Sequence, residues 1–293
     1  MAAGVYFFFP GVTLALAERA ELHAAGLERA SVEVAGHRIV YLVGGSGEPL
    51  LLLHGFGADK SNWVRVARYL TPRFRVIAPD LPGFGESTWD SKAHYAVSDQ
   101  ADRVHAFAQA LGFGPLHVGG NSMGGSIAGV YAARYRQEVK SVWLLAPGGV
   151  RSAKPSQLQE RIGKGDNPLF VRDTEGFERL LDFAFVQRPL IPRPIERYLA
   201  ERAIAHRAIN EKIGEDLQHA PVVLENELAG LPIPALIVWG DHDRLVDVSG
   251  AEVLKGVMPK AEVVILRDVG HVPMVERPDA SARAFLHFQK IES

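Results

Sequence analysis

The sequence predicts an α/β fold with a mostly parallel central sheet flanked by helices. Seven short, apolar runs have the character of buried strands, and amphipathic stretches with helical periodicity separate them. This alternation is typical of a parallel sheet that helices cover on both faces. We expect strands at residues 38–43, 50–53, 74–78, 116–119, 142–146, 235–239 and 263–266, and helices at 62–70, 97–111, 122–136, 249–257 and 278–290.

The alternation is interrupted once, between residues 151 and 231, where helical patterns replace strands. A stretch of this length is too long for a simple loop. We therefore expect three units: an N-terminal helix within residues 1–27, a core formed by residues 28–150 and 232–293, and a helical cap formed by residues 151–231. The apolar cap side chains expected to line a substrate pocket are Leu169, Phe170, Phe177, Leu181 and Phe185.

The composition of the chain excludes several classes of binding and catalytic site. The 293 residues carry 32 basic and 34 acidic side chains, a net charge of −2, so no nucleic-acid partner is expected, because phosphate binding requires a basic face. The absence of cysteine excludes disulfides, thiolate metal sites and a cysteine nucleophile. No cofactor is expected. The run Asp241-His242-Asp243 predicts no metal site, because consecutive side chains point in divergent directions.

The segment Gly120-Asn121-Ser122-Met123-Gly124 fits G-x-S-x-G, and it lies between an expected strand and an expected helix. In this context the motif forms a strained turn that presents the serine hydroxyl above the sheet edge. Side chains at Gly120 and Gly124 would collide with neighbouring backbone. The sequence therefore predicts that Ser122 is a nucleophile, and a glycine-rich turn without chemistry is the alternative.

A serine nucleophile needs a base to take its proton and a third group to orient that base. Among eleven histidines, His271 follows the last expected strand, on a turn at the carboxyl edge of the sheet. Asp243 follows the strand at residues 235–239 at the same edge, whereas Asp241 is interpreted as a residue that shapes the turn. The order Ser122, Asp243, His271 is the order found in α/β-hydrolases.

Five segments together carry a resemblance to a known family: His54–Gly57, Asp80–Ser87, Gly120–Gly125, Trp239–Asp243 and Gly270-His271. From about residue 30 onward the chain resembles the α/β-hydrolases, and within them the bacterial lipases and the membrane-associated monoacylglycerol lipases and phospholipases that share the GNSMGG turn. The resemblance implies a serine carboxylic ester hydrolase that acts on acylglycerols or (lyso)phospholipids through an acyl-enzyme. It also implies that the backbone N–H groups of Phe56 and Met123 form the oxyanion hole.

Two alternatives remain open. Carbon–carbon bond hydrolases of aromatic meta-cleavage products share GNSMGG, but they usually carry His-Gly-x-Gly-Pro-Gly and a Trp after the catalytic Gly-His. This chain has His54-Gly-Phe-Gly-Ala-Asp-Lys60, and Val272 follows His271. A non-catalytic binder on the same fold usually lacks one member of the triad, and all three are present here.

The N-terminal segment Val5–Ala17 has no charged residue and contains Tyr6-Phe7-Phe8-Phe9, an aromatic group typical of a membrane–water boundary. As a helix it would extend ~20 Å, less than the ~30 Å hydrocarbon core. We expect residues 1–27 to associate with a membrane surface, the bacterial inner membrane, as the end of an anchor shortened upstream. The alternative is a cytoplasmic or periplasmic protein in which this helix packs on the body or on a second subunit of a homodimer.

Overall fold

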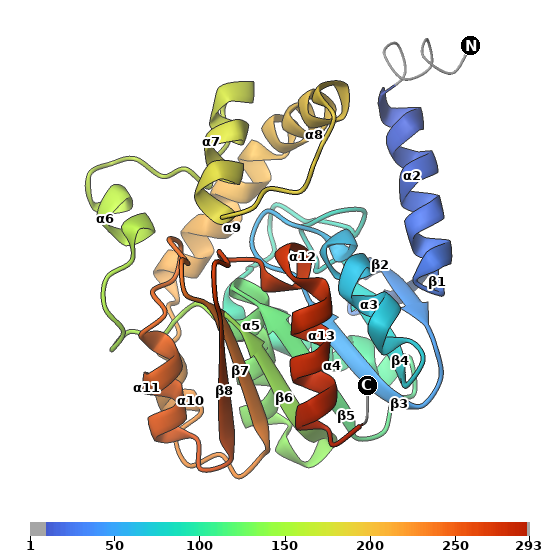
Figure 1. The fold of residues 1–293 in the computed structure, drawn as a ribbon, viewed down its shortest axis with the longest axis vertical. Helices are drawn as coiled ribbons and strands as arrows, with labels where there is room; N and C mark the ends of the chain where they lie inside the picture. Colours follow the sequence, from blue (N-terminus) through green and yellow to red (C-terminus); the bar gives the residue numbers. More distant parts are fainter. Residues whose placement is uncertain (1–9, 292–293) are drawn as a thin grey trace.

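The computed structural model describes residues 10–291, which form an eight-stranded sheet with helices on both faces (Figure 1). The strands lie in the order β1-β2-β4-β3-β5-β6-β7-β8. β1 and β2 are antiparallel to their neighbours, and the remaining six strands are parallel. The strands are β1 (Leu27–Val34), β2 (His37–Gly44), β3 (Glu48–Leu53), β4 (Phe74–Pro79), β5 (Leu116–Asn121), β6 (Val139–Leu145), β7 (Ala235–Gly240) and β8 (Ala261–Leu266).

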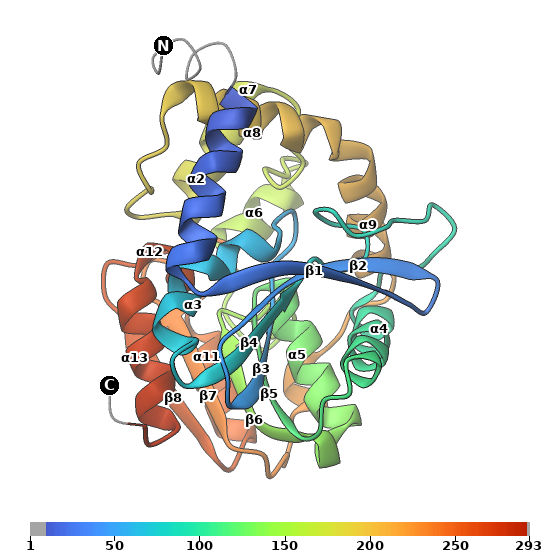
Figure 2. The same ribbon diagram turned by 90° about the vertical axis from the view of Figure 1, so that its right-hand side faces the viewer.

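Helices lie on both faces of the sheet (Figure 2), and an apolar core lies between the sheet and the helices on each face. α3 (Val64–Leu70), α12 (Pro273–Glu276) and α13 (Pro278–Phe288) cover one face, and α4 (Val97–Ala110), α5 (Met123–Arg134) and α11 (Gly250–Val257) cover the other. Consecutive residues of a strand point to opposite faces. In β3, Leu50 and Leu52 therefore belong to the first core, and Leu51 and Leu53 belong to the second.

The predicted α/β fold and its parallel sheet are confirmed, and all seven predicted strands are present. The structure adds β1, which the sequence interpretation missed, and Leu27 begins this strand instead of lying in the N-terminal helix. In β1, the partly exposed apolar residues Ala30, Val32 and Val34 alternate with exposed polar or charged ones, as expected for an edge strand with one face in water. Because β1 contains no continuous apolar run, the apolar pattern that predicts the other strands does not predict this one.

The cap segment (residues 151–231) contains five helices and no strand. They are α6 (Gln157–Gly163), α7 (Thr174–Ala184), α8 (Arg193–Ala205), α9 (Arg207–His219) and α10 (Leu224–Glu227). Asp173 caps α7 by accepting a hydrogen bond from the Gly176 N–H. α7, α8 and α9 lie beyond the carboxyl ends of the parallel strands, where the sequence places the reactive residues (Figure 1).

The first described helix, α2 (Pro10–Ala24), stands beside α8 of the cap segment (Figures 1 and 2). None of its residues is buried, and Val12 and Leu16 are 51% and 62% exposed. Within residues 10–291, no helix is long and apolar enough to cross a membrane. The aromatic group Tyr6–Phe9 lies outside the described residues.

Candidate active site

Ser122 lies in the turn between β5 and α5 with φ +56° and ψ −120°, a conformation that residues with a side chain rarely adopt. Backbone hydrogen bonds hold it there. The Ser122 N–H donates to the Leu145 carbonyl at 3.0 Å, and the Ser122 carbonyl accepts from the Ser126 and Gly148 N–H groups at 3.0 Å each. The hydroxyl is thereby carried at the carboxyl edge of the sheet, where the sequence analysis placed it.

The glycines of this turn are required by close backbone approach. A Cβ atom at Gly120 would lie 2.1 Å from the Gly124 carbonyl oxygen, and one at Gly124 would lie 2.2 Å from the Leu53 carbonyl oxygen. Such distances are far below van der Waals contact, so no side chain fits at either position without moving a strand or the helix. The two glycines of the G-x-S-x-G motif are therefore required by the close packing of this turn against the neighbouring strand and helix.

The structure brings Asp243 and His271 together. Asp243 Oδ2 accepts a hydrogen bond from His271 Nδ1 at 2.7 Å, and the two side chains are 0% and 5% exposed. The other carboxylate oxygen, Oδ1, accepts from the backbone N–H groups of Leu245 and Val246 at 2.8 and 3.0 Å. With Nδ1–H directed at the carboxylate, the second ring nitrogen of His271 is left free to accept a proton.

Asn121 connects this pair to the turn that carries Ser122. Its Nδ2 donates to the backbone carbonyl of His271 at 3.0 Å and to that of Leu145 at 3.0 Å. The residue next to Ser122 thus fixes the chain that carries His271. The other acidic candidate, Asp241, instead accepts from His242 Nδ1 at 2.7 Å, and its side chain is 31% exposed.

The residues of the two predicted oxyanion donors lie near Ser122. Met123 is the first residue of α5, and the first N–H groups of a helix have no partner within it. In the described part of the chain, the Phe56 N–H donates no hydrogen bond. A Cβ atom at Gly55 would lie 3.2 Å from the Ser122 Cβ, so the loop that carries Phe56 runs directly past the serine.

His54 orients this loop. Its Nε2 accepts from the Leu81 N–H at 3.0 Å, so the ring proton lies on Nδ1, which donates to the Gly55 carbonyl at 2.8 Å. The Gly55 carbonyl and the Phe56 N–H belong to one planar peptide group and point in opposite directions. Fixing the carbonyl therefore aims the Phe56 N–H away from His54. Burial lowers the pKa of His54, which keeps the ring in this neutral form.

A buried ion pair supports the other end of the same loop. Lys60 Nζ lies 2.7 Å from the fully buried Asp80 carboxylate, which also accepts from the backbone N–H groups of Lys60 and Glu86 at 2.8 Å each. Burial alone would lower the pKa of Lys60, but the Asp80 carboxylate raises it overall. The sequence did not predict this pair, although Asp80 lies within the segment Asp80–Ser87, which carries part of the family resemblance.

The five predicted pocket residues are all half-buried in the cap segment. The Phe170 ring lies 6.1 Å from that of Phe56, next to the expected oxyanion donor. Leu169 and Phe185 pack around a cluster of Phe183, Ala184 and Leu245, whereas Phe177 and Leu181 lie on α7. Among residues 10–291, no group of three or more His, Asp or Glu side chains is arranged to hold a metal ion.

Residues 48–278 match the family model of the alpha/beta hydrolase fold. The chain belongs to this family. It is 38% identical to Lipase 1 of Psychrobacter immobilis over 92% of this chain and 87% of the relative, and 31% identical to monoacylglycerol lipase abhd6-B of Xenopus laevis over 83% and 76%. These matches confirm the resemblance to lipases and monoacylglycerol lipases.

A solved structure of a bacterial membrane phospholipase A also matches the α/β-hydrolase chain. The TM-score is 0.95 with 49% sequence identity, and the match covers 99% of this chain and 94% of that chain. The likeness therefore includes the cap segment and α2 as well as the sheet. It confirms the resemblance to membrane-associated phospholipases.

Proposed function

We propose that this α/β-hydrolase is a serine carboxylic ester hydrolase that acts on lipid esters, either acylglycerols or (lyso)phospholipids. The observation that carries the proposal is the buried Asp243–His271 hydrogen bond, which Asn121 links to the strained turn of Ser122. The relatives named as lipases and phospholipase A support the lipid class of the substrate.

The proposed mechanism follows from the positions of these groups. His271 takes the proton of the Ser122 hydroxyl as the oxygen attacks the ester carbonyl carbon, and Asp243 stabilises the imidazolium that forms. The Phe56 and Met123 N–H groups donate to the developing oxyanion, a contribution of about 3–4 kcal/mol per donor. Collapse of this intermediate expels the alcohol, which takes the proton from His271. Water then attacks the acyl-enzyme with His271 again as the base.

The test compares wild type with Ser122→Ala and His271→Ala on p-nitrophenyl esters. Each variant should lose several orders of magnitude in kcat, because removal of one member disables the triad. A Ser122→Ala enzyme that retains more than about a tenth of the activity would overturn the assignment. A panel of mono-, di- and triacylglycerols, phospholipids and a meta-cleavage dienoate then separates lipid ester hydrolysis from carbon–carbon bond hydrolysis.

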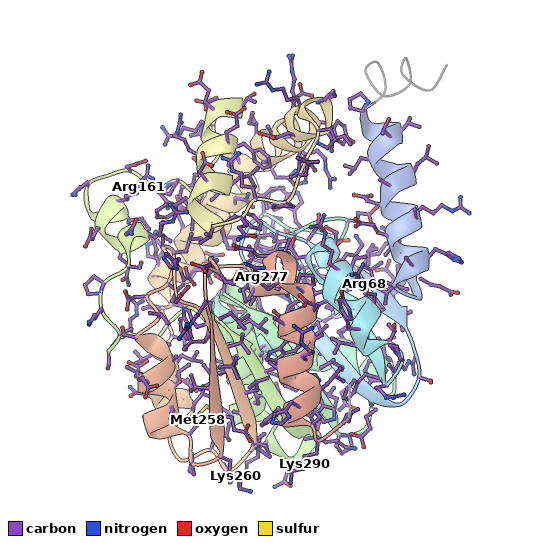
Figure 3. The ribbon with its side chains drawn as sticks, in the orientation of Figure 1. Arg68, Arg161, Met258, Lys260, Arg277 and Lys290 are labelled. Atoms are coloured by element: carbon purple, nitrogen blue, oxygen red, sulfur yellow. The ribbon has the colours of Figure 1, made fainter. Side chains whose placement is uncertain are left out.

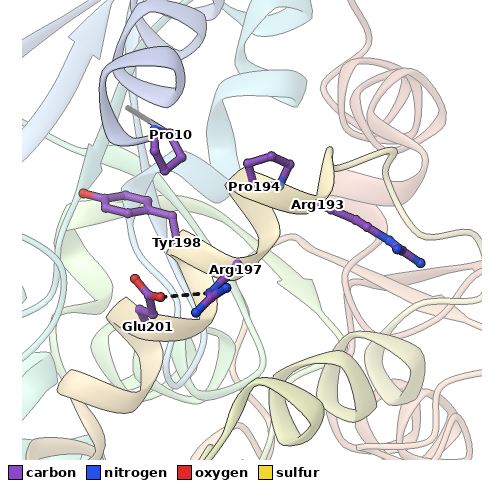
Figure 4. Close-up of a pocket in the computed structure, with 6 residues that line it drawn as sticks. All are labelled: Pro10, Arg193, Pro194, Arg197, Tyr198 and Glu201. Atoms are coloured by element: carbon purple, nitrogen blue, oxygen red, sulfur yellow. Dashed lines mark hydrogen bonds and ion pairs between the residues drawn. The ribbon is translucent and has the colours of Figure 1, made fainter. Parts of the chain in front are cut away.

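We also propose that the cap segment covers the site as a lid and that residues 1–27 bind a membrane surface next to it. Support comes from the exposed apolar side chains Val12 and Leu16 on α2 and from Leu190 of the cap segment, which is 97% exposed. Further support comes from a groove of about 430 Å³ between α2 and α8, because two arginines line it and could attract lipid phosphates (Figure 4). Its lining residues are Pro10, Arg193, Pro194, Arg197, Tyr198 and Glu201.

Vesicle flotation tests the membrane proposal. The full chain should float with phospholipid vesicles, and a variant that starts at Gly26 should not. Equal partitioning of the two proteins would contradict a membrane role for residues 1–27. Sedimentation of both proteins in the absence of lipid then tests the other role, since loss of a homodimer in the shortened variant would assign α2 to a subunit interface.

A further inference from the structure

The C-terminal end of α7 contacts both turns that carry the proposed acid and base. The His271 N–H donates to the Ala184 carbonyl at 2.8 Å. Arg244, the residue after Asp243, directs its Nη2 at two carbonyls of the same segment, those of Asp182 and Phe185, the latter at 2.9 Å. Residues 182–185 of the cap segment thus accept hydrogen bonds both from His271 itself and from Arg244, the neighbour of Asp243.

Glu276 makes a second bridge. Its Oε1 accepts from the Val186 and Gln187 N–H groups at 3.2 and 2.8 Å, and its Oε2 accepts from the Gly270 N–H at 3.0 Å. One carboxylate therefore joins the cap segment to the residue before His271. The approach is close as well, because a Cβ atom at Gly270 would lie 2.4 Å from the Ala184 carbonyl oxygen.

The charges suit this arrangement. The last carbonyls of a helix lack partners within it and carry partial negative charge, which a cation stabilises. The Arg244 guanidinium supplies that cation, and its central carbon lies 5.8 Å from the centre of the Phe183 ring. The Glu276 carboxylate has two acceptor oxygens, so it can accept from the cap segment and from Gly270 at the same time. Figure 1 shows α7 above β7 and β8, the strands that lead into these two turns.

We propose that Arg244 and Glu276 are positioning residues, through which residues 182–187 of the cap segment hold Asp243 and His271 in register with each other. The proposal rests on the proposed triad. In it the cap segment has two parts with different roles: residues 182–187 belong to the frame of the catalytic pair, and the remaining helices surround the substrate. Loss of either bridge displaces the base relative to Ser122, and small displacements of this kind reduce the rate of the chemical step more than substrate binding.

Arg244→Gln and Glu276→Gln are the test variants. Glutamine at 276 matches the shape of glutamate but has a single acceptor oxygen, so it can bond the cap amides or Gly270 and not both. Arg161→Gln is the matched control for Arg244, because Arg161 lies over the same Phe183 ring at 5.3 Å but pairs with Asp166 inside the cap segment. Figure 3 shows Arg161 at α6.

The matched control for Glu276 is Glu225→Gln. Glu225, near the end of the cap segment, accepts from the N–H groups of Arg151 and Ser152 at its beginning, at 3.0 and 2.8 Å for its Oε1. It therefore makes the same type of carboxylate-to-amide bond as Glu276, but within the cap segment and without a hydrogen bond to Asp243, His271 or their neighbours Arg244 and Gly270. A general loosening of the cap segment should lower kcat in this control as much as in the Glu276 variant.

A short soluble substrate, p-nitrophenyl acetate, separates positioning from substrate binding. We expect both test variants to lose about tenfold or more in kcat with little change in KM, and both controls to keep kcat within about twofold of wild type. The downfield proton resonance of His271 Nδ1–H should weaken or shift in the test variants alone. Equal kcat losses in test and control variants, or a change confined to KM, would overturn the proposal.

Two further measurements keep the result decisive. If a glutamine variant does not fold, Arg244→Lys retains the charge but not the planar fork, and its kcat should lie between wild type and the loss expected for Arg244→Gln. A wild-type kcat for a folded Arg244→Lys enzyme would contradict the role of the fork. Ser122→Ala distinguishes the two proposals: if it is inactive while the test variants are fully active, only the positioning role fails.

Discussion

Replacement of Asp243 by Asn tests the proposed triad with minimal change of shape. Oδ1 of Asp243 accepts from two backbone amides, those of Leu245 and Val246, and Oδ2 accepts from His271. In the Asn variant the two amides will hold the single carbonyl oxygen at the Oδ1 position. The amide NH2 group then faces His271 Nδ1 and donates to it, which forces the ring proton onto Nε2. A ring with its proton on Nε2 cannot accept the proton of Ser122.

The expected loss is about 10⁴-fold in kcat, equivalent to about 5.5 kcal/mol of transition-state stabilisation. Steady-state hydrolysis of p-nitrophenyl butyrate measures it, and thermal unfolding verifies that the variant is folded. Asp241→Asn is the control, because Asp241 bonds His242 and not His271. If Asp241→Asn is much the more damaging, or if Asp243→Asn retains more than about a tenth of wild-type kcat, the assignment of the acid is wrong.

Three further outcomes are expected. Since the apolar cap residue Phe170 lies next to Phe56, medium or long acyl esters should have a higher kcat/KM than acetate, because each buried methylene contributes ~0.8 kcal/mol; a steady decline from acetate upward would contradict this. Lys60→Met should lower the free energy of unfolding by about 3–5 kcal/mol in urea titrations, because it leaves the fully buried Asp80 carboxylate without its cation; a loss below ~1 kcal/mol would refute the reasoning. Burial lowers the pKa of His54, so below about pH 6.5 the unfolded chain takes up a proton that the folded chain does not. The free energy of unfolding should therefore decrease as pH falls from that value, by up to ~1.4 kcal/mol per pH unit for this residue, and His54→Asn should make the slope shallower, whereas an unchanged slope would assign the pH dependence to other groups.

Much of the fold could be predicted because buried parallel strands leave a local signature. Continuous apolar runs such as Leu50–Leu53 and Val142–Leu145 are buried on both faces of the sheet, so each residue in them is apolar. The turn at Ser122 could also be predicted from local residues. Backbone atoms lie so close to Gly120 and Gly124 that no residue with a side chain fits at either position. Steric requirements of this kind determine the residue types of a short segment, so the sequence of that segment is enough to predict them.

Contacts between distant segments could not be predicted in this way. The Lys60–Asp80 pair and the bonds of Glu276 to the cap segment join residues 20 and about 90 positions apart, and an isolated Lys or Glu carries no sign of its partner. The same holds for Arg244, which follows Asp243 directly and resembles any surface arginine in the sequence. The order of Ser122, Asp243 and His271 was recognisable as a motif, but the groups that hold the acid and the base were not.

The three members of the proposed triad are therefore held in two different ways. Ser122 is fixed by the sheet and by α5, through backbone hydrogen bonds and glycine contacts that leave the turn no alternative conformation. Asp243 and His271 lie on turns after β7 and β8. The Arg244 side chain, next to Asp243, and the backbone N–H of His271 donate to carbonyls at the end of α7 in the cap segment. A change in the cap segment will then act on the base and its orienting acid while the nucleophile stays in place. Substitutions in residues 182–187 should consequently change kcat, and substitutions elsewhere in the cap segment should mainly change KM and the preference for acyl chain length.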